Sequence, residues 1–93
     1  MVKHVVCMKF KDRGEAPKIA QMLRSLVGKV PTLLSMEVGL DYMQSQRSYD
    51  LVLIATYASR EALDAYSVHP EHKKVQEYIH GVREAVVAVD YEY

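Results

Sequence analysis

The sequence predicts an α+β fold in which helices cover one face of an antiparallel sheet. Four stretches rich in β-branched and aromatic residues are typical of strands. Between them lie stretches in which apolar residues recur every three or four positions, as they do on one side of an amphipathic helix. The length of 93 residues favours a single domain, 1–93.

The first strand is predicted over residues 3–10, KHVVCMKF, because side chains that alternate along a strand point to opposite faces of the sheet. One face carries His4, Val6, Met8 and Phe10, and the other carries Lys3, Val5, Cys7 and Lys9. Only the first of these faces is expected to meet the helices.

The first helix is predicted to begin near Pro17, where the missing N–H of proline costs little at an early helical position. Its apolar stripe consists of Ile19, Met22, Leu23, Leu26, Val27 and Val30. Gly28 and Pro31 are expected to end this helix.

Two further strands are predicted over residues 33–43 and 49–57. The first of these would place Leu34, Met36, Val38 and Leu40 on one face. The second, YDLVLIATY, is a nearly continuous apolar run, which predicts burial on both faces.

The next segment predicts a helix pair and a last strand. Ser59 is expected to cap a short helix with Leu63 and Tyr66 on its inner side. A second helix is expected from Pro70 to about Gly81, with an inward stripe formed by His72, Val75, Ile79 and Val82. Residues 85–93 form the last predicted strand. This order of elements is the ferredoxin-like split β-α-β pattern, with a four-stranded antiparallel sheet and helices on one face.

The uncovered face of this sheet predicts a homodimer. Val5, Cys7, Val52 and Ile54 would lie there without cover from the chain itself, with Lys3, Lys9 and Asp50 near the rim. An exposed apolar face of this kind requires a partner, and a second copy related by a two-fold axis is the economical one.

Composition argues against several classes of partner. Lys+Arg and Asp+Glu are both 12, so there is no basic face for nucleic acid or for anionic lipid, and no apolar run is long enough to span a membrane. The single cysteine, Cys7, and a start without a signal peptide predict a cytoplasmic protein. No cofactor motif is present. His69 and His72 are three residues apart, but zinc requires three or four ligands, so no metal site is expected.

Four segments together resemble the stress-responsive dimeric α+β barrel (Dabb) family: VKHVVCMKFKD at the start, YDLVLIATYASREALDAY, the HPEH turn and the final VVAVDYEY. The resemblance implies a ferredoxin-like chain whose sheet closes into a barrel with that of a second chain. One plant branch of the family is a polyketide cyclase. Its pocket lies between helices and sheet, and a His–Tyr pair there promotes an intramolecular aldol condensation.

The resemblance to that branch implies a site. Tyr66 and His72 match the catalytic tyrosine and histidine of the cyclase, and His4 matches a further pocket histidine. Leu23 and Leu51 stand where the cyclase has a pocket tyrosine and a pocket histidine, so the pocket here would be more apolar.

Three functions remain open from the sequence. The protein could bind a small apolar or aromatic ligand without catalysis, with His4, Leu23, Leu51, Tyr66 and His72 around the ligand. It could be a cyclase-like lyase with His72 as general base and Tyr66 and His4 assisting. It could also be a purely structural or stress-protective oligomer in which Tyr66 and His72 only close the helix–sheet layer. Four other tyrosines are assigned either to the pocket or to the dimer seam: Tyr49, Tyr57, Tyr78 and Tyr91.

Overall fold

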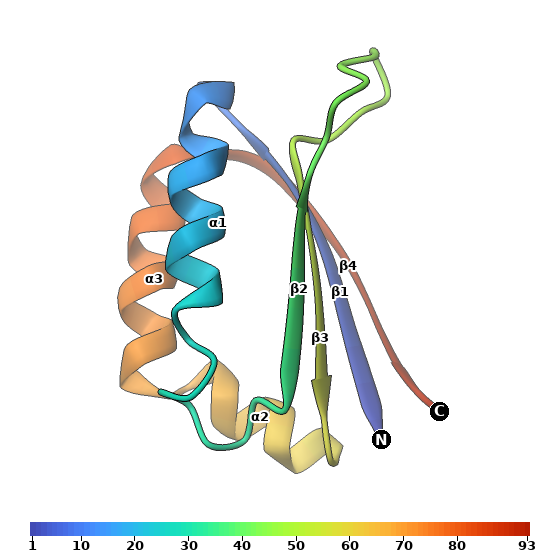
Figure 1. Ribbon diagram of the computed structural model, residues 1–93, viewed down its shortest axis with the longest axis vertical. Helices are drawn as coiled ribbons and strands as arrows, with labels where there is room; N and C mark the ends of the chain where they lie inside the picture. Colours follow the sequence, from blue (N-terminus) through green and yellow to red (C-terminus); the bar gives the residue numbers. More distant parts are fainter.

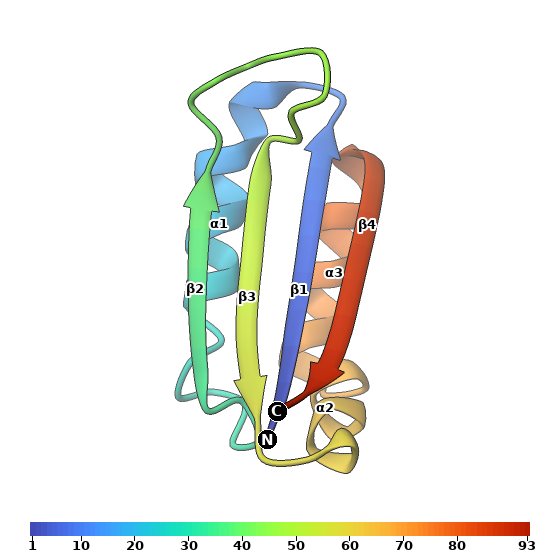
Figure 2. The ribbon, with the colours of Figure 1, turned by 90° about the vertical axis from the view of Figure 1, so that its right-hand side faces the viewer.

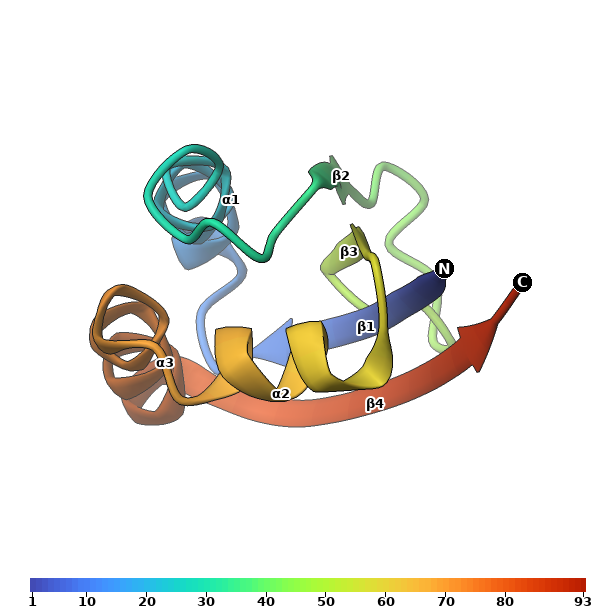
Figure 3. The ribbon, with the colours of Figure 1, turned by 90° about the horizontal axis from the view of Figure 1, so that it is seen from below.

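The computed structural model describes all residues, 1–93, as one sheet with helices on one of its sides (Figure 1). The elements are β1 (Val2–Phe10), η1 (Arg13–Glu15), α1 (Ala16–Arg24), β2 (Ser35–Leu40), β3 (Leu51–Tyr57), α2 (Arg60–Ser67), α3 (Pro70–Val82) and β4 (Arg83–Glu92). Seen from one end, α1 and α3 lie side by side against the strands (Figure 3).

The strand order is β2-β3-β1-β4, and every neighbouring pair is antiparallel. Val6 at the centre of β1 lies opposite Leu53 of β3 and Ala88 of β4. The predicted α+β, ferredoxin-like architecture is therefore confirmed, with the first and last strands adjacent as the split β-α-β pattern requires. No helix is both long and apolar enough to cross a membrane.

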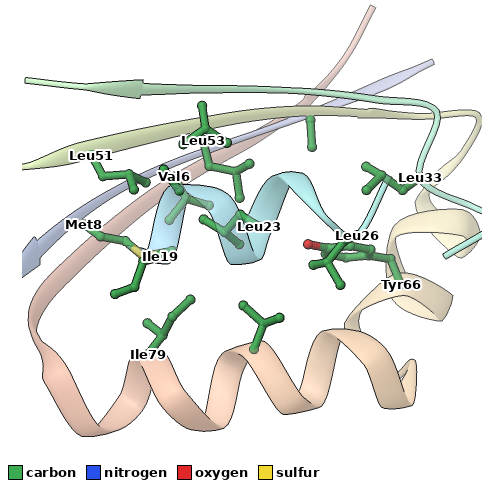
Figure 4. Close-up of a cluster of buried hydrophobic side chains, with 14 of the residues drawn as sticks. Val6, Met8, Ile19, Leu23, Leu26, Leu33, Leu51, Leu53, Tyr66 and Ile79 are labelled. Carbon is green, nitrogen blue, oxygen red and sulfur yellow. The ribbon is translucent and has the colours of Figure 1, made fainter. Parts of the chain in front are cut away.

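The core lies between helices and sheet (Figure 4). The strict alternation of β3 directs four side chains into it, Leu51, Leu53, Ala55 and Tyr57. The intervening residues of β3 are only half-buried on the opposite face. The prediction that both faces of this strand are buried is therefore wrong for the single chain, because an antiparallel sheet can leave one face open.

The first helix is shorter than its apolar pattern predicts. It ends at Arg24, and the chain continues to Val30 in tight turns with Gly28 at a φ of +89°. Leu26 and Val30 still reach the core, but Val27 is exposed. The turns reverse the chain toward β2, so the helical period no longer governs which side chains face inward.

The strand predicted over 33–43 is restricted to β2. Val38 is buried and Met36 is half-buried, whereas Leu34 and Leu40 at the two ends are exposed. Because β2 is an edge strand, it has a pairing partner only where it runs beside β3. The side chains of Met36 and Val38 face the core as predicted, but the exposed fraction of the side chains increases toward both ends of the strand.

The two helices of the pair each begin at a side-chain cap. The Ser59 Oγ accepts the N–H of Ala62 at 3.1 Å and begins α2, which confirms the predicted cap. The His69 Nδ1 accepts the N–H of Glu71 at 3.1 Å, directly before Pro70 begins α3. The His69 cap lies at the corner between α2 and α3, and Tyr66 and His72 project from the two sides of that corner.

Asp50 does not lie at the rim of the uncovered face. Its carboxylate is buried, accepts the N–H of Phe10 at 2.9 Å and pairs with Arg13 at 2.8 Å. The carboxylate turns back over the end of β1 because these two donors satisfy it there. Asp50 therefore ties β3, β1 and η1 together at one end of the sheet.

The other face of the sheet carries no helix (Figure 2). The pairing places an apolar strip on this face, formed by Val5, Cys7, Val52, Ile54, Val87, Val89 and Tyr91. We call this set the open-face strip. Val87 and Val89 of β4 are among its most exposed side chains.

Candidate functional site

A cavity of about 240 Å³ lies on the helix side of the sheet, between α3 and strands β1 and β4. Its lining consists of His4, Val6, Met8, Leu23, Leu53, Tyr66, Ser67, His72, Gln76, Ile79, Arg83, Val86 and Ala88. Apolar side chains therefore form most of its surface, with a few polar groups among them, as is usual for small-molecule sites. We call it the helix–sheet cavity.

Tyr66 enters this cavity from the last turn of α2 (Figure 4). Its side chain is 1% exposed, and its ring packs on the ring of Tyr57 with 5.2 Å between centroids. The hydroxyls of both tyrosines are buried and have no hydrogen-bond partner in the protein. Such groups are rare, because leaving a buried hydroxyl unpaired costs free energy.

Burial keeps both phenols neutral. Desolvation raises the pKa of Tyr66 to about 12. Desolvation also raises the pKa of Tyr57, and the nearby Tyr66 adds to the effect. The two hydroxyls are close enough to influence each other's pKa, but their geometry does not form a hydrogen bond between them. The Tyr66 O–H is therefore an unpaired donor on a residue that lines the cavity.

His72 lies on the first turn of α3 and faces the same space. Its ring packs against that of Tyr66 at a tilt of 40°, with centroids 4.3 Å apart, and its Nδ1 is 3.1 Å from the carbonyl oxygen of Ser67. Since a carbonyl only accepts, Nδ1 carries the proton, and in the neutral ring Nε2 is left as the acceptor. His72 is thus hydrogen-bonded to the backbone and not to Tyr66.

Burial lowers the pKa of His72, although the Ser67 carbonyl opposes this shift and the other nearby histidines add to it weakly. The neutral imidazole is therefore favoured near neutral pH. A neutral histidine with a free Nε2 next to a phenol donor has the parts of a general base beside a group that can stabilise a developing oxyanion.

His4 reaches the cavity from β1. Its Nδ1 contacts the Asp90 carboxylate, which lies directly opposite on β4. The ring of His4 also lies edge-on to Tyr57, with centroids 6.4 Å apart. Asp90 orients this histidine and was not among the predicted site residues, although its position on the helix-side face of the last strand could have indicated the pair.

The structure brings together four of the five predicted site residues. His4, Leu23, Tyr66 and His72 all line the helix–sheet cavity, whereas Leu51 does not. Leu51 is buried on the same sheet face, but β3 contributes only Leu53 to the cavity, whose floor is otherwise β1 and β4. Of the two leucines that were expected to make the pocket more apolar than that of the cyclase, only Leu23 lines the cavity.

Sequence reasoning missed several lining residues. Gln76 follows His72 by four residues, and Arg83 follows Gln76 by seven, which is the spacing of one face of a helix. This spacing could have revealed them. Tyr57 does not line the cavity but packs against Tyr66, and its alternation with Leu53 and Ala55 could have assigned it to the helix side.

The remaining candidate ligands of a metal are dispersed. His69 uses its Nδ1 to cap α3, and Cys7 lies on the opposite face of the sheet. No group of three or more His, Cys, Asp or Glu side chains is placed to hold a metal ion. The expectation of a metal-free site stays a prediction.

The fold and the cavity define a ferredoxin-like α+β domain with a ligand-sized space between its helices and its sheet. Residues 2–93 match the family model of the stress responsive A/B barrel domain (Dabb), and the chain belongs to this family. The family expected from the four sequence segments is therefore confirmed.

Several curated proteins are similar along nearly the whole chain. The stress-response A/B barrel domain-containing protein HS1 of Arabidopsis thaliana is 27% identical over 97% of this chain and 87% of its own length. Olivetolic acid cyclase of Cannabis sativa is 25% identical over 97% of this chain and 94% of its own length. Two longer stress-response A/B barrel domain-containing proteins of Arabidopsis thaliana are 28% and 29% identical, and the chain spans only 36% and 46% of their lengths.

Solved structures share the fold. A dimeric protein of unknown function from Bacteroides fragilis is 25% identical, with a TM-score of 0.82 over 99% of this chain and 95% of its own. A dimeric ferredoxin-like protein from Thermobifida fusca is 21% identical, with a TM-score of 0.86 over 99% and 90% of the two chains. A hydroxynitrile lyase from Passiflora edulis is 15% identical, with a TM-score of 0.83 over 97% and 90%. At such identities the likeness shows the fold alone.

Proposed function

We propose that the protein is a homodimer that binds a small apolar or aromatic molecule in the helix–sheet cavity of each protomer. The observation that carries this proposal is the buried, unpaired hydroxyl of Tyr66 in a largely apolar cavity. An apolar wall favours an apolar body, and the free O–H donor favours one polar atom on that body.

The dimer is the second part of the proposal. The open-face strip would meet its own copy across a two-fold axis, as relatives described as dimeric suggest. The cavity lies on the opposite side of the sheet, so dimerisation leaves it accessible. The single cysteine, half-buried on the open face, is compatible with the cytoplasm, where we place the protein.

A thermal-shift screen of small aromatic and aliphatic compounds tests the binding. A ligand at about 100 times its Kd stabilises the native state by about 2.7 kcal/mol, which is readily measured as a rise in Tm. His72→Ala and Tyr66→Phe are expected to reduce the rise. His80→Ala is the matched control, because His80 lies exposed on the same helix and outside the cavity. A screen without any stabilising compound, or shifts that all cavity variants retain, would contradict the proposal.

A second candidate function is a cyclase-like lyase, and the hydrogen bonding of His72 favours it. With Nδ1 bound to the Ser67 carbonyl, the free Nε2 could take a proton from a carbon next to a substrate carbonyl. Tyr66 would donate to the carbonyl oxygen as it gains charge, and His4 would assist at the other side. The resulting enolate would form a carbon–carbon bond with a second carbonyl of the same molecule. This chemistry is the one that the relative olivetolic acid cyclase suggests.

The test of catalysis is turnover of linear poly-β-carbonyl compounds. Loss of the base is expected to lower kcat by about 10²–10⁴-fold in His72→Ala, with His80→Ala unchanged. Equal turnover in His72→Ala and the unaltered protein would remove His72 from the mechanism and leave the binding proposal standing.

A further inference from the structure

The helix–sheet cavity has one fully charged side chain, and it is unpaired. Arg83 lines the cavity from the junction of α3 and β4. Three other arginines have partners for their guanidinium groups. Arg13 pairs with Asp50, Arg60 pairs with Glu92, and Arg24 donates a hydrogen bond to the backbone carbonyl of Val38. Arg83 is half-buried and makes neither an ion pair nor a side-chain hydrogen bond.

A purely structural role for Arg83 is the first alternative. A cation next to the last turn of a helix can bind the free carbonyls there and interact favourably with the helix dipole. However, the guanidinium makes no hydrogen bond to those carbonyls, whereas the Arg83 backbone N–H already donates to the Ile79 oxygen. The charge is therefore left free for another group.

The lining offers this charge no acid. Its polar members are His4, Ser67, His72, Gln76 and the phenol of Tyr66, besides Arg83 itself. Asp90, the carboxylate next to the cavity, is engaged by His4. A guanidinium in such surroundings gains most from a carboxylate, which it can bind through two parallel N–H donors.

The polar groups also occupy separate ends of the cavity. His72 lies on the first turn of α3, and Arg83 is the residue directly after the helix, eleven positions further on, so their Cα positions are about 16 Å apart at the rise of an α-helix. Gln76 and the apolar Ile79 lie between them on the same face. An occupant that uses both ends must be elongated, with an apolar middle.

We propose that the helix–sheet cavity selects monoanionic ligands, namely carboxylic acids with an apolar or aromatic body, whose carboxylate pairs with Arg83 while the body extends toward Tyr66 and His72. This inference rests on the proposed ligand-binding function and adds the charge of the ligand and its orientation. Burial lowers the pKa of His72 and so favours its neutral form, which leaves Arg83 as the permanent cation of the site.

Calorimetric titration with phenylalkanoates, from phenylacetate to 6-phenylhexanoate, and with the corresponding neutral primary amides tests the inference. At about pH 7.5 the best acid is expected to bind at least about tenfold more tightly than its amide, since a charge-assisted bidentate pair is lost in the amide. In Arg83→Gln this preference should fall below about threefold, while affinity for the amide is retained.

Two variants control the experiment. Arg47→Gln makes the same charge change in an exposed loop and should keep the full preference. Arg83→Lys retains the charge without the planar fork and should keep part of it. Because arginine does not titrate, the preference should also be the same at about pH 8 and about pH 6, where the acids stay ionised.

The outcomes separate the two proposals. Equal binding of acid and amide to the unaltered protein overturns the selection of anions but leaves ligand binding intact. A preference that survives in Arg83→Gln and strengthens at the lower pH assigns the carboxylate to a histidine and also overturns the role of Arg83. Failure of the whole series, acids and amides alike, to bind overturns both proposals.

Discussion

The hydroxyl of Tyr66 is expected to lower the stability of the protein and to strengthen the binding of a ligand. Its buried hydroxyl has no partner in the protein, and such a group costs about 1–3 kcal/mol. Tyr66→Phe is therefore expected to raise the free energy of unfolding by about 1 kcal/mol in urea denaturation, while it weakens ligand binding.

The matched variant is Tyr78→Phe, because the Tyr78 hydroxyl donates to the Glu15 carboxylate at 2.7 Å. That change is expected to lower the free energy of unfolding by about 1 kcal/mol. A clear loss of stability in Tyr66→Phe would mean that its hydroxyl is hydrogen-bonded in the protein, and would remove the main support for a polar ligand contact there.

His72 makes stability depend on pH. Its pKa in the folded protein lies below the ordinary value of about 6.5 that the unfolded chain has, mainly because burial disfavours the charged ring. As the pH falls through about 6.5, the unfolded state takes up the proton first, so the free energy of unfolding decreases until the folded-state pKa is passed. Above that range both states are neutral at this residue and the effect vanishes.

The corresponding measurement is the free energy of unfolding at about pH 7.5 and about pH 5.5. His72→Gln should show a smaller loss of stability on acidification than the unaltered protein, because glutamine does not titrate. His80→Gln removes an exposed histidine of the same helix and should leave the loss as it is. A pH dependence that is identical in His72→Gln would show that His72 is not the titrating group.

At the scale of elements, the corner between α2 and α3 positions the site. Ser59 starts α2 by accepting the Ala62 N–H, and α2 in turn carries Tyr66. Ser59→Ala is expected to lower the free energy of unfolding by about 1 kcal/mol, because the capped N–H loses its partner. Ser59→Asp should restore most of it, since aspartate caps equally well and its charge suits the helix N-terminus. Urea denaturation of the three proteins measures this, and a fully stable Ser59→Ala would show that the cap contributes nothing.

The elements also show where periodicity succeeds and where it fails. On the inward face of β1, alternation predicted the buried side chains Val6, Met8 and Phe10 correctly, because β1 is paired with a neighbour on each side along its length. In the segment after Arg24 it placed Val27 inward, although the chain had already left the helix. Asp50 was misplaced for a similar reason, since its carboxylate follows two specific donors and not the alternation of the strand.

At the scale of the whole molecule, the open-face strip predicts self-association. Val89→Glu would place a charge in the middle of the proposed interface, where burying it without a partner is costly. In light scattering at micromolar concentration, the unaltered protein is expected to have the mass of a dimer, and Val89→Glu that of a monomer.

Val68→Glu is the control for this change. Val68 is 64% exposed at the end of α2 and Val89 is 63% exposed in the sheet, so both substitutions add a charge at an equally exposed position, one outside the open face and one on it. Val68→Glu should remain dimeric. A dimer that tolerates Val89→Glu would place the interface elsewhere.

The sequence by itself determined the order and type of the elements, the two faces of the sheet and the family. Those properties depend on local period, on caps such as Ser59 and on patterns that repeat within a few residues. It also indicated His4, Leu23, Tyr66 and His72 as members of one site, through the resemblance to a family with a known pocket.

Only the tertiary structure decided the contents of that site. The His4–Asp90 contact joins residues 86 positions apart, and the unpaired state of Tyr66 and Arg83 depends on every neighbour that packs around them. Leu51 was excluded from the cavity in the same way, because β1 and β4, and not β3, form most of the floor. Whether a buried polar side chain has a hydrogen-bond or ion-pair partner depends on all the residues that pack around it, so no local sequence pattern predicts it.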